Sequence, residues 1–164
     1  MIQGKLLIKY FLIFLLVCVI VLYVYQNYRT VSVAYHTNPN MNITDRYTLT
    51  TDTNKTIPLI PVITDEQHTW GLSLIPSLDR DQGMIFVFAQ PQQLGFWMRD
   101  MLFPLDMIWL DATMRIVDIH TNISPNTYPE IFSPSVPAQY VIELPAGAAK
   151  NHGFSKGQQI YIAK

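Results

Sequence analysis

The residues best suited to chemistry are concentrated in one stretch, Phe96–Asp111. It reads FWMRDMLFPLDMIWLD and holds two tryptophans, an arginine and three carboxylates, in a chain of which only 14% of residues are charged. An arginine presents a planar fork of donors that fits a carboxylate or a phosphate. Exposed aromatic side chains form stacking surfaces for a sugar or a planar ligand. The structural alternative is that the apolar side chains form core and the arginine makes an internal ion pair. The candidate ligand-binding residues here are Trp97, Met98, Arg99, Asp100 and Asp106.

A hairpin is expected to add a sixth candidate, His120. The apolar runs 105–111 and 115–120 flank residues 112–114, which predicts a three-residue hairpin loop. Counting back from a pair between Asp111 and Arg115 sets Asp106 opposite His120 on one face of the sheet. A bulge or a two-residue loop would instead put the two side chains on opposite faces. Asp106 itself either accepts hydrogen bonds from backbone amides of a turn or serves as a ligand acceptor or general base.

Other chemistries find little support in the sequence. The four histidines are scattered, and the single cysteine, Cys18, lies within an apolar run, so we predict no metal site and no cofactor. No Gly-x-Ser-x-Gly elbow is present, and we assign no catalytic residue. The net charge of −1 and the lack of a basic stripe argue against a nucleic-acid partner. Two-carboxylate hydrolysis, with Asp106 beside Asp111 or Asp118, remains an alternative.

Residues 6–25 predict a membrane segment. After Lys9 this run carries no charge, and about 20 apolar residues span a bilayer. Lys5 and Lys9 lie at its start, which favours a cytoplasmic N-terminus and an exported remainder. We therefore expect a cytoplasmic segment 1–5, a signal anchor 6–25 that contacts lipid, a polar linker 26–47 and an extracytoplasmic or periplasmic domain 48–164. The alternative is a signal peptide cleaved after Ser32-Val33-Ala34.

The part beyond residue 48 reads as a β-dominated α+β domain. Many short strands and two short helices predict a strongly curved, mostly antiparallel sheet or a small open barrel. Thr64 and Gln67 form a capping box at the start of one helix. A second helix is expected within 145–152, because proline opens that segment and glycine follows it. Glu143 alternates with Ile142 and Leu144, which predicts a strand face exposed to solvent.

Several landmarks in this domain occur in a fixed order. They are Gly71-Leu72, Gly83–Phe88, Phe96–Arg99, Pro104–Ile108, Asp111, Pro125, Tyr140–Leu144, Ala146-Gly147 and Gly157. In these landmarks the chain resembles the bacterial and archaeal family called domain of unknown function 192, over most of residues 64–164. The resemblance implies a single small domain, often exported or anchored, without an established activity. The chain departs from the family pattern at Ser73, at Asp100-Met101 and at Ala112-Thr113.

Three function classes fit the sequence. The first is a membrane-tethered extracytoplasmic binding or accessory domain for an unknown small molecule. The second is a single-span subunit of a larger membrane complex, in which part of the apolar surface forms an interface. The third is a carboxylate-dependent hydrolase. The absence of a nucleophile, metal or cofactor motif favours the first.

The topology is testable with a reporter fused after Lys164. Because the lysines precede the apolar run, we expect the C-terminus to be exported and the chain to remain in the cytoplasmic (inner) membrane. A reporter active only outside the cytoplasm should therefore be active in the fusion. Activity of a reporter that works only in the cytoplasm would reverse the predicted orientation.

Overall fold

The computed structural model describes residue 10 and residues 13–23, 47–51 and 54–164. The chain divides into two compact units, Met1–Met41 and Asn42–Lys164. In the first unit, residues 13–23 are helical. Among the described residues, no helix has both the length and the apolar character needed to cross a membrane. The predicted span 6–25 extends beyond the described residues and most of the linker 26–47 lies outside them, so the anchor stays a prediction.

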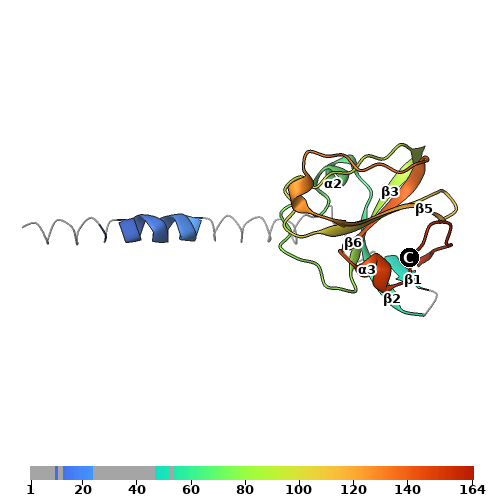
Figure 1. The fold of residues 1–164 in the computed structure, drawn as a ribbon, viewed down its shortest axis with the longest axis horizontal. Helices are drawn as coiled ribbons and strands as arrows, with labels where there is room; N and C mark the ends of the chain where they lie inside the picture. Colours follow the sequence, from blue (N-terminus) through green and yellow to red (C-terminus); the bar gives the residue numbers. More distant parts are fainter. Residues whose placement is uncertain (1–9, 11–12, 24–46, 52–53) are drawn as a thin grey trace, which may run out of the picture. The chain divides into compact units, whose positions relative to one another are not determined.

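The second unit is built on one seven-stranded mixed sheet (Figure 1). The strands are β1 (Tyr47–Thr50), β2 (Thr56–Val62), β3 (Gly83–Gln92), β4 (Leu105–Leu110), β5 (Ile116–Ile123), β6 (Ala138–Pro145) and β7 (Tyr161–Ala163). Their order across the sheet is β5-β4-β6-β3-β2-β1-β7. Only β2 and β3 pair in parallel. The β-dominated α+β class predicted from the sequence is confirmed.

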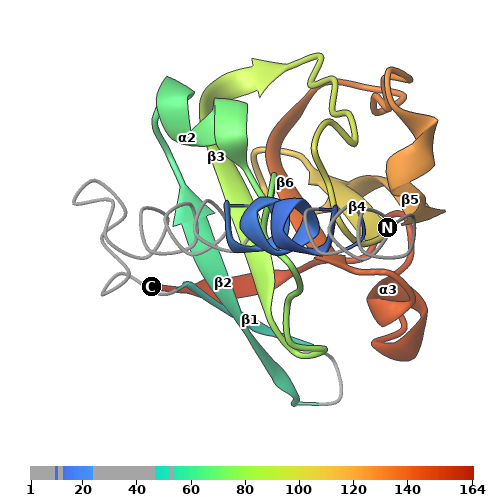
Figure 2. The ribbon, with the colours of Figure 1, turned by 90° about the vertical axis from the view of Figure 1, so that its left-hand side faces the viewer.

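Few helices accompany this sheet. They are α2 (Asp65–Trp70), α3 (Ala148–Asn151) and a 3-10 turn, Pro125–Thr127. α2 and α3 lie at opposite ends of the domain in both ribbon views (Figures 1 and 2). α3 is shorter than the helix that the sequence predicts within 145–152.

The sheet is not closed, because β5 and β7 are its two edge strands. The two edges nevertheless meet where the chain enters each strand. Ile116 donates to the Gln158 carbonyl, Gly157 donates to the Ile116 carbonyl, and Ile160 donates to the Met114 carbonyl. A sheet whose edges approach in this way must curve, and its ladders contain register irregularities at which strands can bend.

The two faces of β6 are both buried, but they are buried against different neighbours. Ile142 and Leu144 belong to the main apolar core, together with Ile85 and Ile108. Glu143 points to the other face, and it is only 4% exposed. The predicted solvent-exposed face of β6 is therefore wrong. The physical reason is that β6 is a central strand between β3 and β4, and chain segments cover its second face as well.

The β4–β5 hairpin confirms the predicted loop but not the predicted register. Asp111 and Arg115 flank three loop residues, and Asp111 donates to the Arg115 carbonyl at 2.9 Å. Two register shifts interrupt this ladder, and the one between Leu110 and Trp109 lies between the loop and His120, so that His120 lies opposite Met107 and not opposite Asp106. Because neighbouring residues of a strand point to opposite faces, the predicted pairing of Asp106 with His120 is wrong.

Thr64 begins α2 as the sequence predicts. Its hydroxyl oxygen accepts a hydrogen bond from the Gln67 amide at 3.2 Å, and the Gln67 side chain accepts from the Thr64 amide at 3.1 Å. These two bonds form the capping box. The helix ends at Gly71, whose φ of +46° lies in a region that side chains disfavour. A Cβ at Gly71 would also lie 3.0 Å from the Phe86 ring.

Thr64→Ala should lower the free energy of unfolding by about 0.5–2 kcal/mol, because it removes the acceptor for a free amide of the first turn. Urea or thermal unfolding of the full chain measures this loss. Thr64→Ser is the matched control, since it keeps the hydroxyl oxygen and should stay close to the parent. Equal unfolding midpoints for the alanine and serine variants would show that the cap does not stabilise the domain.

Candidate functional site

The main candidate site is a pocket of about 260 Å³ between α2, β3 and the loop that follows β3. Five aromatic side chains line it, with His68 as a sixth ring. Within the described part of the chain, the polar lining consists of Thr69, Ser73, two glutamines and Glu143, without lysine, arginine or aspartate. The aromatic residues are Trp70, Phe86, Phe88, Phe96 and Trp97.

The inner wall of the pocket is formed by aromatic side chains that contact one another in succession. His68 stacks on Phe88 with the ring centroids 4.3 Å apart, and its Nε2 lies 3.1 Å from the Val62 carbonyl oxygen. Phe86 meets Phe96 edge to face at 4.8 Å. Phe96 in turn meets the buried Trp109 at 6.2 Å. Since Trp109 also donates to the Leu94 carbonyl at 3.1 Å, the loop after β3 is held against the sheet. The wall is therefore a preformed surface.

The rim of the pocket carries two half-exposed tryptophans, Trp70 (48%) and Trp97 (45%). Arg99 lies behind Trp97, with its guanidinium carbon 5.0 Å from the ring centroid. The same guanidinium donates to the Thr69 carbonyl at 3.2 Å and lies 3.9 Å from the Asp100 carboxylate. Arg99 thus connects the loop to α2, and its ion pair with Asp100 is the structural alternative that the sequence suggested.

Glu143 is the unusual residue of the site. It extends from β6 between Met84 of β3 and Met107 of β4, and it lines the pocket. Its Oε2 is buried and has no hydrogen-bond partner among the described residues. Burial disfavours the charged form and raises the pKa of the Glu143 carboxyl to about 8. At neutral pH this carboxyl is mostly protonated, so it can donate as well as accept a hydrogen bond.

The residues proposed from the sequence occupy different places. Trp97 alone among them lines the pocket within the described part of the chain. Met98 is core at 1% exposure. Asp106 is fully buried, and its two oxygens accept from the Asn122 and Ala149 amides, each at 2.8 Å. Asp106 therefore connects the end of β5 to α3. Of the two roles considered from the sequence, this is the structural one, in which the carboxylate accepts hydrogen bonds from backbone amides.

His120 lies on the opposite face of the hairpin from Asp106. Its ring packs on Trp109 at 4.9 Å and on Phe132 at 5.8 Å. These contacts place it in the aromatic layer behind the pocket wall, and it is not among the residues that line the pocket.

Sequence reasoning missed the main pocket residues, Glu143, His68, Phe86 and Phe88. A carboxyl placed alternately with apolar residues reads as an outward-facing group when strand order is unknown. The available signal was that Glu143 is the one charged residue in 138–149, a segment otherwise rich in core residues. For the aromatic residues, no local signal separates a pocket wall from core.

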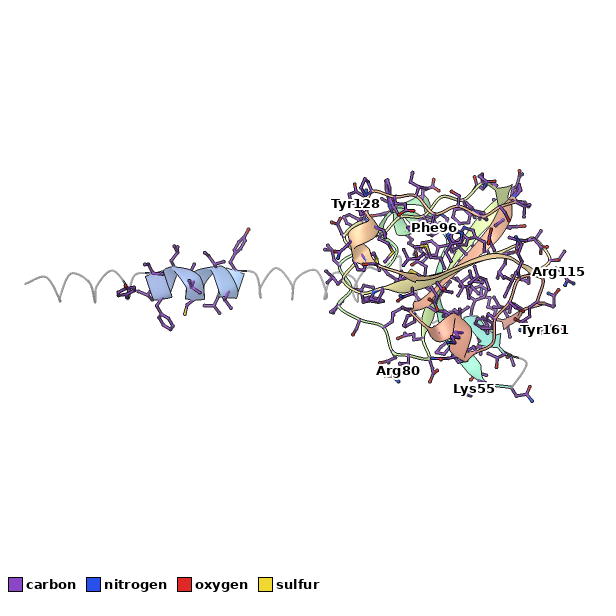
Figure 3. The ribbon with its side chains drawn as sticks, viewed as in Figure 1. Lys55, Arg80, Phe96, Arg115, Tyr128 and Tyr161 are labelled. Carbon is purple, nitrogen blue, oxygen red and sulfur yellow. The ribbon has the colours of Figure 1, made fainter. Side chains whose placement is uncertain are left out.

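A second hollow of about 550 Å³ lies near α3, lined by Lys55, Arg80, Asp81 and His152 among others. Figure 3 shows Lys55 and Arg80 at the far end of the domain from Phe96. His152 Nε2 lies 3.6 Å from an Asp81 carboxylate oxygen. Charges of both signs and exposed side chains make this a less defined site. Within the described residues, no group of three or more His, Cys, Asp or Glu side chains is placed to hold a metal ion.

The sequence matches a known family over the whole sheet, residues 47–162. That family is DUF192, described as Uncharacterized ACR. The chain belongs to the DUF192 family. This confirms the resemblance drawn from the landmark residues. No curated protein matches the chain in sequence.

Two solved structures show the same domain. One is described as a candidate transcription regulator from Sinorhizobium meliloti 1021; it is 30% identical, with a TM-score of 0.64, over 71% of this chain and 91% of that one. The other is a protein of unknown function from Novosphingobium aromaticivorans DSM 12444; it is 25% identical, with a TM-score of 0.65, over 73% and 84% of the two chains. Neither description names a ligand.

Glu143 should give the stability of the domain a distinct pH dependence. Between its ordinary pKa of 4.5 and its raised pKa of about 8, the folded chain holds a proton that the unfolded chain has released. The stabilisation from this group is therefore complete below that window. It falls by up to about 1.4 kcal/mol per pH unit as the pH rises through the window, and becomes constant above it.

Glu143→Gln removes this titration and leaves the other groups in place. The free energy of unfolding of the parent minus that of the variant, measured by urea unfolding across the window, should fall with rising pH. A difference that stays constant across the window would show that Glu143 ionises normally in the folded chain.

Proposed function

We propose that this DUF192 protein is a binding domain for a small molecule, with its site in the aromatic pocket and Glu143 as the polar contact. The observation that carries the proposal is the buried carboxyl of Glu143, which lines the pocket while its Oε2 has no partner among the described residues. As the sequence suggests, residues 6–25 would tether the domain to the extracytoplasmic face of the membrane.

An unpaired buried polar atom is costly. Leaving a buried acceptor without a partner costs roughly 1–3 kcal/mol, and an apolar residue of similar shape avoids that cost. Stability alone therefore gives no reason for a glutamate between Met84 and Met107. A ligand that bonds to this carboxyl would recover part of the cost, which is the pattern expected of a binding site.

The size and lining of the pocket restrict the ligand. A volume of about 260 Å³ lies just below the roughly 300–1,000 Å³ of pockets for drug-sized molecules, so the ligand is small. The aromatic walls favour a compact apolar or ring-shaped body. Because no lysine or arginine among the described residues lines the pocket, these residues offer a phosphate or a carboxylate no such counter-charge.

The hydrolase alternative loses its proposed residue, because both oxygens of Asp106 already accept from backbone amides. A carboxyl with a pKa of about 8 suits general acid or base chemistry, and Glu143 has one. However, Glu143 is the only carboxyl that lines the pocket within the described residues, so two-carboxylate hydrolysis is not supported there.

The membrane-complex alternative draws on a different observation. Trp97, Tyr128 and Ile131 are exposed large apolar residues, and Trp97 contacts Tyr128 at a centroid distance of 6.0 Å. Such residues suit a protein interface as well as a ligand. A pull-down of the detergent-solubilised protein that recovers stoichiometric partners would favour this alternative.

The binding proposal is tested by a thermal-shift screen of the full chain in a nonionic detergent against neutral, cationic and anionic small molecules. We expect at least one compound to raise the unfolding temperature, and Trp97→Ala and Glu143→Gln to reduce that rise. Tyr161→Ala, on an exposed residue of β7 outside the pocket, is the control. A screen without any stabilising compound, or a rise that neither pocket variant changes, would contradict the proposal.

A further inference from the structure

We propose that the pocket binds an organic cation, a small molecule with a substituted ammonium group that lies between the aromatic rings and the Glu143 carboxyl. This inference rests on the proposed function and narrows it to one class of ligand. It is carried by the charges that line the pocket, by the aromatic walls and by the position of the buried carboxyl.

The charges around the pocket are unbalanced. Of the described residues that line it, the titratable ones are His68 from α2 and Glu143 from β6. The cross-strand neighbours of Glu143, Met84 and Met107, carry no charge. None of the described lining residues is a lysine or an arginine that could pair with Glu143. A cationic ligand would pair with the Glu143 carboxylate once the carboxyl has released its proton.

Arg99 contacts the Trp97 side chain at the rim, but it does not pair with Glu143 in the pocket. Its guanidinium lies against Trp97 and donates to the Thr69 carbonyl, with the Asp100 carboxylate at 3.9 Å. It is not among the residues that line the pocket. Asp100 offsets its charge, so the repulsion it exerts on a cation in the pocket is reduced.

The aromatic lining favours a cationic ligand over most neutral ligands. The face of an aromatic ring carries negative electrostatic potential, and substituted ammonium groups are recognised by cages of such rings. Here Trp70, Phe88 and Trp97 contribute to a pocket with five aromatic residues. The Arg99 guanidinium carbon lies over the Trp97 ring, 5.0 Å from its centre, which is within the range of a cation–π contact.

Cation binding and the protonation of Glu143 are then linked. A positive charge beside the carboxyl favours its ionised form, so binding releases the proton that burial had retained. Affinity for the cation should rise with pH, by up to roughly tenfold per unit, until Glu143 is ionised in the free protein. His68 is the other titratable side chain among the described lining residues, so the test must separate the two residues.

The experiment compares choline with 3,3-dimethylbutan-1-ol, an uncharged molecule of the same shape in which carbon replaces the ammonium nitrogen. Isothermal titration calorimetry on the full chain in a nonionic detergent gives the dissociation constant of each. We expect choline to bind roughly tenfold more tightly or better at a pH of about 9, and this preference to shrink towards a pH of about 6. Release of a proton on binding appears as a dependence of the measured heat on the buffer.

Two variants identify the groups responsible. Glu143→Gln should abolish most of the preference for choline and its pH dependence while binding of the neutral alcohol persists, which separates Glu143 from His68. Trp97→Leu keeps an apolar side chain on the exposed rim but removes the ring face. It should weaken choline roughly threefold or more, and weaken the alcohol less. It serves as the second variant if Glu143→Gln fails to fold.

The outcomes distinguish this inference from the proposed function. Equal or tighter binding of the neutral alcohol would overturn the cation inference and leave a binding site for neutral molecules. Failure of both probes would also overturn it, and the screen described above would then decide separately whether the pocket binds any small molecule. A preference for choline that survives Glu143→Gln unchanged would remove the carboxyl from the inference and overturn it as stated.

Discussion

The structure depends on the position of β6 between β3 and β4. β6 pairs with both neighbours along most of its length, so the backbone groups on both of its edges are satisfied. Residues 141–144 are buried on both faces of the strand. One face contributes Ile142 and Leu144 to the main core. The other face contributes Glu143 to the pocket. A single strand thus provides both the centre of the fold and a buried carboxyl oxygen without a hydrogen-bond partner among the described residues.

The pocket exists because a second layer covers that other face. α2 and the loop between β3 and β4 bring rings against Phe86 and Trp109, and Arg99 connects the loop to α2. Edge-to-face contacts fix the inner rings, whereas Trp70 and Trp97 remain half exposed at the rim. A rigid inner wall with an open aromatic rim is the arrangement expected when a ligand must be held with little rearrangement of the protein.

The two buried carboxyls of the sheet show how their surroundings decide their roles. Asp106 has both oxygens bonded to backbone amides, so its burial supports the junction of β5 with α3. Glu143 has an orphaned oxygen and a pKa raised to about 8 by burial alone. A satisfied buried carboxylate stabilises a fold, whereas an unsatisfied one destabilises it unless something else binds there. Both side chains are carboxylic acids, so the difference between their roles comes from their hydrogen-bond partners.

The sequence by itself determined the features that depend on interactions between residues close together in the chain. The Thr64 capping box, the three-residue loop after Asp111, the β-dominated class and the DUF192 family all follow from short patterns. The tertiary structure decided the rest. One register shift, between Leu110 and Trp109, placed His120 opposite Met107, because a shift of one residue reverses which face the following side chains occupy. Strand order buried Glu143, because a period of two identifies a face but does not say what covers it. Burial and strand pairing depend on contacts between segments that are distant in the sequence. The pocket is formed by those contacts, so local sequence patterns do not predict it.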